Sequence, residues 1–96
     1  MSDKSEKARK LDVRSAIVKV CKGLPTKHFR QVTLAILSLL QNATPHDSAA
    51  LLEHQPWRRI DIGEYRVIYQ FDADTVYVAL IGKRNDAAVY KRLRRF

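Results

Sequence analysis

The spacing of apolar residues changes once along the chain, and this change constrains the fold more than any other feature of the sequence. Between residues 17 and 40 the apolar side chains recur every three or four positions, as on one face of an α-helix. From residue 57 to residue 81 they alternate with other side chains, as in half-buried β-strands. Helices followed by a run of strands predict an α+β fold in which the helices cover one face of a sheet.

Two helices are predicted in the first half of the chain. Gly23 and Pro25 end the first, whose apolar face consists of Ile17, Val20, Cys21 and Leu24. Thr26 is a suitable N-cap for the second, which is expected over about residues 27–41 with an apolar stripe of Phe29, Val32, Ile36, Leu37 and Leu40. A short strand ending near residue 14 is predicted before them. The polar residues 1–9 are expected to form a mobile tail, and residues 10–96 a single domain.

Three antiparallel strands joined by tight turns are predicted over residues 57–62, 65–71 and 75–81. Gly63 is the first residue of a two-residue loop, which favours a type II′ turn and pairs Asp61 with Arg66. The other expected pairs are Ile62 with Tyr65, Ile60 with Val67, Arg59 with Ile68, Phe71 with Val76, Tyr69 with Val78, Val67 with Leu80 and Arg66 with Ile81. Residues 43–56 are predicted to be a loop with one helical turn near residues 49–52. A short last helix over residues 86–95 is expected to bury Val89 and Leu93.

These pairings assign the strand side chains to two faces, because alternate residues of a strand point to opposite sides of a sheet. The face that the helices are expected to cover collects Ile60, Ile62, Tyr65, Val67, Tyr69, Phe71, Val76, Val78 and Leu80. The other face is mixed and carries Arg59, Asp61, Arg66, Ile68, Gln70, Tyr77, Ala79 and Ile81. The predicted fold is therefore a small antiparallel sheet with two N-terminal helices on one face and a short C-terminal helix.

The positive charge is concentrated at one end of the sequence. The net charge is +8, from 18 basic and 10 acidic residues. Residues 11–82 are nearly neutral, with eight basic and seven acidic side chains, whereas residues 83–96 carry six basic and one acidic. So dense a basic block indicates a polyanionic partner or, alternatively, a solvated helix face that aids solubility.

Several classes of site and location are disfavoured by the sequence. His28, His46 and His54 are far apart and lack an acidic cluster beside them, so no metal site is expected. The three glycines are isolated, so no phosphate loop and no nucleotide cofactor are expected. The apolar stretch 32–40 is too short to span a membrane, and the N-terminus lacks the apolar core of a secretory signal. Cys21, the one cysteine, is predicted to be a buried apolar side chain in a cytoplasmic protein.

Arginine and tyrosine remain as the residues that could carry chemistry. Arg66 lies in mid-strand on the face away from the helices, where its alternative role is a cross-strand ion pair with Asp61. Arg84 follows the last strand and could equally be a surface charge, and Tyr90 could be a rim contact. Together they suit a phosphodiester, since arginine binds phosphate through two hydrogen bonds and offsets charge that develops during phosphoryl transfer.

Two segments resemble the RelE/ParE superfamily of bacterial toxin–antitoxin toxins. They are Gly63-Glu64-Tyr65-Arg66-Val67-Ile68-Tyr69 and, after a hairpin, Gly82-Lys83-Arg84-Asn85-Asp86 with Val89-Tyr90. The resemblance covers roughly residues 10–95 and implies the fold described above. RelE-like members are mRNA endonucleases that act in the ribosomal A site, whereas ParE-like members inhibit DNA gyrase and tend to lack the basic and tyrosine residues of the nuclease site.

The arginines and tyrosine of this sequence favour the nuclease branch. By the family's pattern, Arg66 is expected to hold the scissile phosphate, Arg84 to stabilise the transition state, and Tyr90 to stack on a base and assist proton transfer. Arg59 matches a further basic position of the site, and Arg58, Lys83 and Lys91 are expected to contact RNA. The RNA 2′-hydroxyl is implied as the nucleophile, giving a 2′,3′-cyclic phosphate without a metal or other cofactor.

One position departs from the family's pattern. RelE-like sites usually place a second basic residue on the strand before the Gly63 turn, but here that position is Asp61. A carboxylate paired with Arg66 would compete with the phosphate, or could itself be the general base. Glu53 and His54 in the preceding loop are the other candidate bases.

The resemblance also implies partners. One is an antitoxin protein with an acidic or amphipathic segment, expected at Arg92, Arg94 and Arg95, and the other is mRNA on the bacterial ribosome. The alternatives are a ParE-like protein that inhibits gyrase by binding, and a domain that binds nucleic acid without cleaving it.

Overall fold

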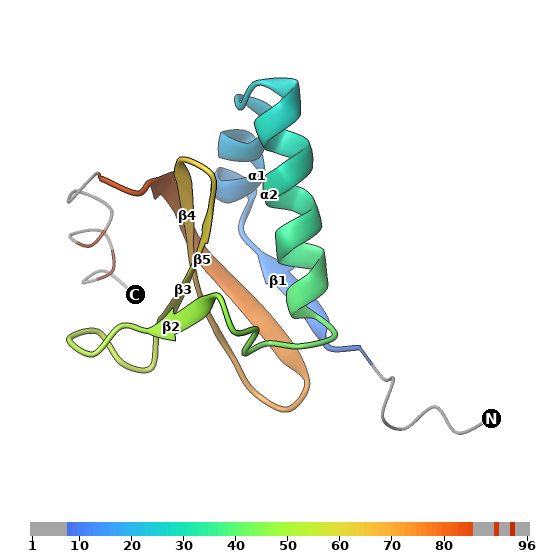
Figure 1. Cartoon of the computed structure of the whole chain (residues 1–96). Helices are drawn as coiled ribbons and strands as arrows, with labels where there is room; N and C mark the ends of the chain where they lie inside the picture. Colours follow the sequence, from blue (N-terminus) through green and yellow to red (C-terminus); the bar gives the residue numbers. More distant parts are fainter. Residues whose placement is uncertain (1–7, 86–89, 91–92, 94–96) are drawn as a thin grey trace.

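A five-stranded sheet with two helices on one face forms the body of the molecule. The computed structural model describes residues 8–85, Tyr90 and Leu93. The strands are β1 (Lys10–Val13), β2 (Ser48–Ala50), β3 (Arg58–Ile62), β4 (Tyr65–Phe71) and β5 (Thr75–Lys83), and the helices are α1 (Ser15–Lys22) and α2 (Thr26–Leu39). The strand order is β1-β5-β4-β3-β2, and both helices lie on the same side of the sheet (Figure 1). The predicted α+β fold is confirmed.

The helices begin and end close to the predicted residues. Gly23 caps α1, and its N–H donates to the carbonyls of Lys19 and Val20 at 3.1 Å. The second helix begins at Thr26 itself, so the N-cap is Pro25 and not Thr26. Proline suits the start of a helix because its ring fixes φ, here −53°, and it carries no N–H that needs a partner.

The hairpin of β3 and β4 has the predicted register. Asp61 lies opposite Arg66, and Ile62 lies opposite Tyr65. Gly63 has φ of 59°, which is the left-handed conformation that the first position of a type II′ turn requires. The turn therefore fixes which side chains of β3 and β4 become neighbours.

The hairpin of β4 and β5 departs from the prediction at a β-bulge. Phe71 pairs with Val76 and Tyr69 with Val78, as expected, but Ile68 pairs with Leu80, so Ala79 is an extra residue. Beyond the bulge Val67 pairs with Ile81 and Arg66 with Gly82, so the two predicted pairs there are wrong. Because an extra residue reverses the alternation, Ile81 packs under the helices and Leu80 on the opposite face.

The two edge strands also differ from the prediction. β1 pairs with β5 in parallel, so the sheet is mixed and not wholly antiparallel. Residues 48–50 form β2, antiparallel to β3, and the helical turn predicted near residues 49–52 is wrong. So short a strand has no alternation of its own to signal it, and it is stabilised by the edge of β3 with which it pairs.

Buried side chains form one cluster on each face of the sheet. The larger lies between sheet and helices and includes Val32, Leu39, Val67 and Tyr69, whose hydroxyl donates to the Ala43 carbonyl at 2.6 Å. Cys21 packs at its margin, and burial raises the pKa of the thiol. The smaller cluster consists of Ile68, Ala79, Leu80 and Leu93.

The ends of the chain are described in part. Tyr90 and Leu93 are helical, and Leu93 is buried as predicted. Val89 and the rest of the predicted helix lie outside the described residues, as do residues 1–7 of the predicted tail. Arg9, in contrast, donates a hydrogen bond to the Asp72 carbonyl at 2.7 Å.

Candidate functional site

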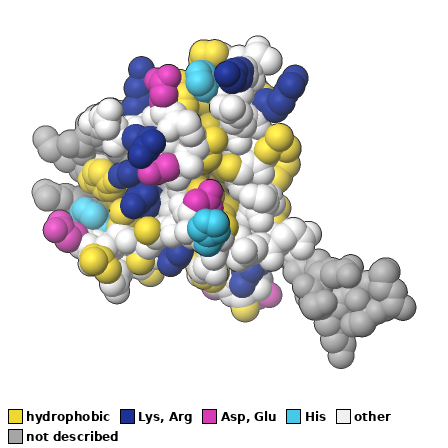
Figure 2. Space-filling model, viewed as in Figure 1, with side chains coloured by type: hydrophobic (Ala, Val, Ile, Leu, Met, Phe, Trp, Pro, Cys, Tyr) yellow, Lys and Arg dark blue, Asp and Glu magenta, His cyan; other side chains and the backbone are white. Residues whose placement is uncertain are grey.

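Three arginines converge on one carboxylate on the face of the sheet away from the helices. The register of β3 and β4 places Arg66 opposite Asp61, and strand alternation places Arg59 on the same face. Arg84 follows β5, and its backbone N–H donates to the Glu64 carbonyl at 2.9 Å, beside the turn that contains Gly63. Figure 2 shows Lys and Arg side chains gathered around an acidic side chain on the surface of the molecule.

Asp61 accepts hydrogen bonds or ion pairs from all three guanidinium groups. Arg66 Nε lies 2.6 Å from Asp61 Oδ1, and Arg66 Nη2 lies 3.1 Å from Oδ2. Arg59 Nη1 is 3.0 Å from the same Oδ2, and Arg84 Nε is 3.4 Å from it. The carboxylate therefore lies between three guanidinium groups, which are strong donors to anionic oxygens.

The cluster is partly buried and keeps an excess of positive charge. Side chains of Arg66 and Asp61 are 16% and 19% exposed, whereas Arg84 is 51% exposed. The hydrogen bond from Arg66 holds the pKa of Asp61 below its usual range, and Asp61 in turn raises the pKa of Arg66. Three cations and one anion leave the site able to attract a further anion, with Arg84 the most accessible donor.

Tyr90 lies at the edge of this cluster. Arg66 Nη1 donates a hydrogen bond to the Tyr90 hydroxyl, and the guanidinium carbon lies 5.9 Å from the centroid of the tyrosine ring. The ring also stacks with His54, with centroids 5.9 Å apart and planes 15° from parallel. A cavity of about 340 Å³ adjoins them and is lined by Tyr90, His54 and Glu53 among others. Glu53 is exposed there.

The predicted site residues thus fall into two groups. Arg59, Asp61, Arg66, Arg84 and Tyr90 are brought together, and the predicted ion pair of Asp61 with Arg66 is present. Arg58 lies apart, because strand alternation turns it to the helix-bearing side, where its Nη2 donates to Ser48 Oγ at 2.8 Å. Lys83 pairs with Tyr65 in the sheet and is on that same side, one consequence of the bulge. Lys91, Arg92, Arg94 and Arg95 lie outside the described residues.

Two contacts of predicted site residues could not be found by sequence reasoning. Ser48 had no recognised role because β2 was not predicted. The stack of His54 on Tyr90 joins a loop to the C-terminal segment, and neither residue spacing nor periodicity signals such a contact. Strand alternation was sufficient to predict that Arg59, Asp61 and Arg66 lie on one face of the sheet.

The described residues offer an anion site and no obvious metal site. Among residues 8–85, 90 and 93, no three His, Cys, Asp or Glu side chains come together as ligands. In the same part of the chain, no helix combines the length and apolarity that a membrane crossing requires. The chemistry available at the cluster is that of guanidinium, phenol, carboxylate and imidazole groups.

Comparison with known proteins gives structural matches only. No family model matches the sequence, and no curated protein matches it significantly. A double mutant of E. coli toxin RelE in the free state has a TM-score of 0.77 and 21% identity, over 92% of this chain and 96% of that one. In the archaeal RelE–RelB complex from Pyrococcus horikoshii, the matching chain gives 0.70 and 23%, over 83% and 99%. In the toxin–antitoxin complex RelBE2 from Mycobacterium tuberculosis, it gives 0.66 and 16%, over 82% and 94%. This chain therefore has the fold of the RelE toxins.

Proposed function

We propose that this protein is the toxin of a toxin–antitoxin pair and that it cleaves mRNA in the ribosomal A site without a metal. Two observations support the proposal: the RelE fold, and the convergence of Arg66, Arg84 and Tyr90 on one face of the sheet. The second carries more weight, because a fold alone does not determine a function. The site of action would be the cytoplasm, where mRNA is translated.

In the proposed reaction the RNA supplies its own nucleophile. The 2′-hydroxyl attacks the adjacent phosphorus, the bond from phosphorus to the 5′-oxygen breaks, and a 2′,3′-cyclic phosphate and a 5′-hydroxyl form. One proton leaves the 2′-oxygen and one reaches the 5′-oxygen. Arg66 holds a non-bridging oxygen, and the accessible Arg84 offsets the charge that develops in the transition state.

The proton transfers are assigned to the Tyr90 side of the site. The low pKa of Asp61 makes its carboxylate a weak proton acceptor, so we assign it the role of competitor for the arginines and not of base. The Tyr90 hydroxyl already accepts a hydrogen bond from Arg66, which holds it beside the group that binds the phosphate. His54, stacked on Tyr90, is the second group able to exchange a proton there.

The decisive experiment is to induce the protein in a bacterial host and map RNA 5′ ends on a translated and an untranslatable version of one mRNA. We expect cuts in the translated message alone. Arg84→Ala should abolish the cuts while remaining folded, and Arg30→Ala, which removes an exposed arginine of α2, should retain them. A folded Arg84→Ala protein that still cleaves would refute the assignment, and cuts in both messages would refute the need for the ribosome.

A second candidate function is inhibition of DNA gyrase by binding, as in ParE-like toxins. The observation in its favour is that Asp61 engages all three arginines and so opposes phosphate binding. Growth arrest with intact mRNA, together with loss of supercoiling by purified gyrase, would select this function over cleavage.

We also propose an antitoxin partner with an acidic amphipathic segment. An apolar groove of about 210 Å³ lies between α1, α2 and β1, and Val18, Phe29 and Leu37 line it. Residues 13–46, which include both helices, contain five Lys or Arg and no Asp or Glu. An apolar helix face flanked by carboxylates complements such a surface.

Charge reversal in the groove tests this docking site. Lys22 lines the groove, so Lys22→Glu should weaken binding of the antitoxin. Lys27→Glu, on the same pair of helices but outside the groove lining, is the matched control. Equal affinity of both variants in titration calorimetry would place the antitoxin elsewhere.

A further inference from the structure

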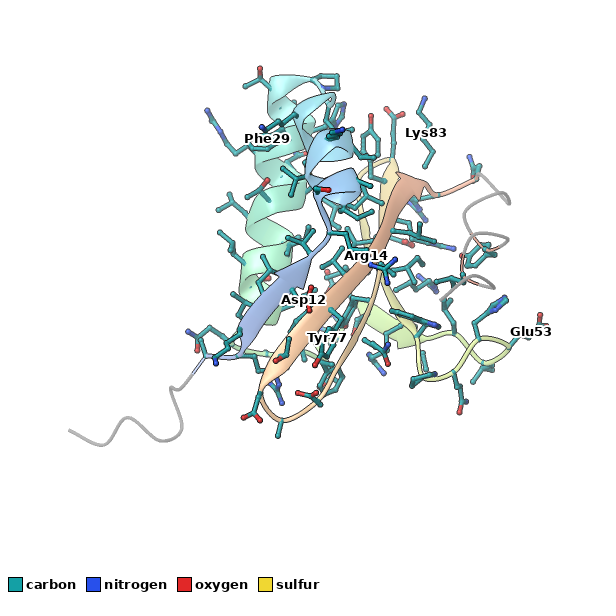
Figure 3. The ribbon with its side chains drawn as sticks, turned by 180° about the vertical axis from the view of Figure 1, so that it is seen from behind. Asp12, Arg14, Phe29, Glu53, Tyr77 and Lys83 are labelled. Atoms are coloured by element: carbon teal, nitrogen blue, oxygen red, sulfur yellow. The ribbon has the colours of Figure 1, made fainter. Side chains whose placement is uncertain are left out.

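A second cavity lies on the same face of the sheet as the arginine cluster. It has a volume of about 240 Å³ and a mixed lining. The side chains around it that can stack or form hydrogen bonds are Asp12, Arg14, Trp57, Gln70 and Tyr77. Figure 3 shows Asp12 on β1 and Tyr77 on the neighbouring strand β5, Arg14 between β1 and α1, and Lys83 toward the other end of β5. None of these residues takes part in the site described above.

Four of these side chains form one row across the sheet. Asp12 of β1 lies opposite Tyr77 of β5, and Tyr77 lies opposite Gln70 of β4. Trp57 directly precedes β3. Because Arg58 lies opposite Tyr69 in this antiparallel pair, Trp57 lies at the level of Gln70 and extends the row. Tyr77 Oη donates to Asp72 Oδ2 at 3.1 Å, which restrains the ring. The half-buried rings of Tyr77 and Trp57 thus flank the Gln70 amide, and the Asp12 carboxylate lies beyond Tyr77.

This combination of side chains suits a nucleobase. Aromatic rings stack on any base and contribute about 1–3 kcal/mol per stacked base. The Gln70 amide both donates and accepts, so it can bind a base edge through two hydrogen bonds. The Asp12 carboxylate only accepts, so it favours a base with an exocyclic amino group, as in adenine or cytosine, over uracil.

The cavity lies within reach of the same RNA strand as the arginines. Arg66 and Gln70 are on one face of β4, and four residues of strand separate them by about 13 Å. Between their rows lies the apolar cluster that contains Ile68 and Ala79. This cluster is buried and includes Leu93, so a single strand with its phosphate at the arginines would pass beside it to place a neighbouring base in the cavity.

We propose that this cavity is a nucleobase subsite that selects an amino-bearing base near the cleaved phosphate. The inference rests on the proposed function, since it takes single-stranded RNA as the ligand. It adds a specificity element, the row of Asp12, Tyr77, Gln70 and Trp57, which acts through base stacking and hydrogen bonds and not through phosphate contacts.

Trp57 offers a direct test, because it is the one tryptophan of the chain and lines the cavity. The probes are short 2′-O-methyl oligonucleotides of adenine and of uracil, which lack the attacking hydroxyl and carry equal charge. We expect a saturable change in Trp57 fluorescence with both, and an affinity about tenfold higher for the adenine probe. Inorganic phosphate alone should leave the fluorescence unchanged.

Substitutions then separate the subsite from general attraction to a polyanion. Gln70→Ala and Asp12→Asn should each reduce the preference for adenine severalfold, and Tyr77→Ala should weaken both probes about tenfold. Gln41→Ala, an exposed glutamine outside the cavity, is the matched control for Gln70→Ala and should behave as the unsubstituted protein. Correct folding of each variant is checked by its circular dichroism.

The outcomes distinguish this inference from the proposed function. Equal affinity for the two probes, or an unchanged preference in the folded Gln70→Ala and Asp12→Asn variants, would overturn the subsite even if the protein cleaves mRNA. A preference for adenine that Gln70→Ala removes supports the subsite, and because the probes cannot be cleaved, this result does not depend on nuclease activity.

Discussion

Replacing Asp61 with asparagine should make the protein less stable and a better ligand for RNA. The substitution keeps the shape of the side chain and one acceptor oxygen, but it removes the negative charge that three arginines share. The folded protein loses an attractive interaction, whereas an incoming phosphate loses its competitor. Stability and RNA affinity are therefore expected to change in opposite directions.

The contacts of Asp61 set the size of both effects. Its shortest bond, 2.6 Å from Arg66, joins two side chains less than a fifth exposed, and hydrogen bonds between charged groups contribute about 1.5–3 kcal/mol. The contact with Arg84 counts for little, because that side chain is half exposed. We expect a loss of about 2 kcal/mol in the free energy of unfolding, or roughly 10 °C in melting temperature for a domain of this size. Solvent also screens the repulsion between the Asp61 carboxylate and a bound phosphate, so removing this charge should raise the affinity for RNA about tenfold.

Urea denaturation and binding of a 2′-O-methyl RNA probe measure the two quantities on the same preparation. Asp74→Asn, an exposed aspartate at the turn between β4 and β5, is the matched control for the change in net charge. If Asp61→Asn destabilises the protein but binds RNA no more tightly than Asp74→Asn does, the carboxylate does not compete with phosphate and the reasoning fails.

Three further predictions concern stability. Because arginine contacts lower the pKa of Asp61, the contribution of this carboxylate to stability is present above the unfolded-state pKa of about 3.9 and is lost as the pH falls through the lower folded-state value. In an acid titration, the stability difference between Asp61→Asn and the unsubstituted protein should therefore shrink below about pH 4. Tyr69→Phe leaves the Ala43 carbonyl without its donor inside the core and should cost about 1–2 kcal/mol in urea denaturation; a cost near zero would mean that water replaces the hydroxyl. Gly63→Ala should cost about 1 kcal/mol by the same assay, all of it from the left-handed backbone, since the added Cβ would meet nothing closer than Gln31 Oε1 at 3.9 Å; no loss would show that the turn relaxes.

Local patterns predicted most of the fold. The helical period gave both helices, and the glycine turn gave the whole register of β3 and β4. The bulge at Ala79 was missed because either alternation of Val78 to Ile81 is apolar, so the sequence does not distinguish a regular strand from one with an extra residue. β2 was missed because three residues are too few to show a period, and its existence depends on the edge of β3.

In the candidate site, too, the residues set by local patterns were predicted and those set by tertiary packing were not. Residues within one hairpin, such as Asp61 and Arg66, were grouped correctly because turn geometry fixes their separation. Contacts that depend on tertiary packing were not predicted: His54 stacks on Tyr90, and Ser48 holds Arg58. The side of the sheet on which Arg58 lies follows from strand alternation, and its assignment to the RNA contacts did not take this into account. The row of Asp12, Tyr77 and Gln70 needed the parallel pairing of β1 with β5, which no local signal specifies.

That parallel pairing also bears on the order in which the chain folds. Lys10 pairs with Thr75, so β1 and the helices after it find their place only when β5, near the other end of the sequence, is present. The hairpins of β3, β4 and β5 pair neighbours in sequence and can form early, whereas closing the long loop between β1 and β5 is entropically costly and slow. During synthesis the apolar faces of α1 and α2 would emerge from the ribosome well before the strands that bury them. The groove that we assign to a partner lies beside those same faces, so a partner that binds them early would protect the chain from aggregation as well as restrain its activity.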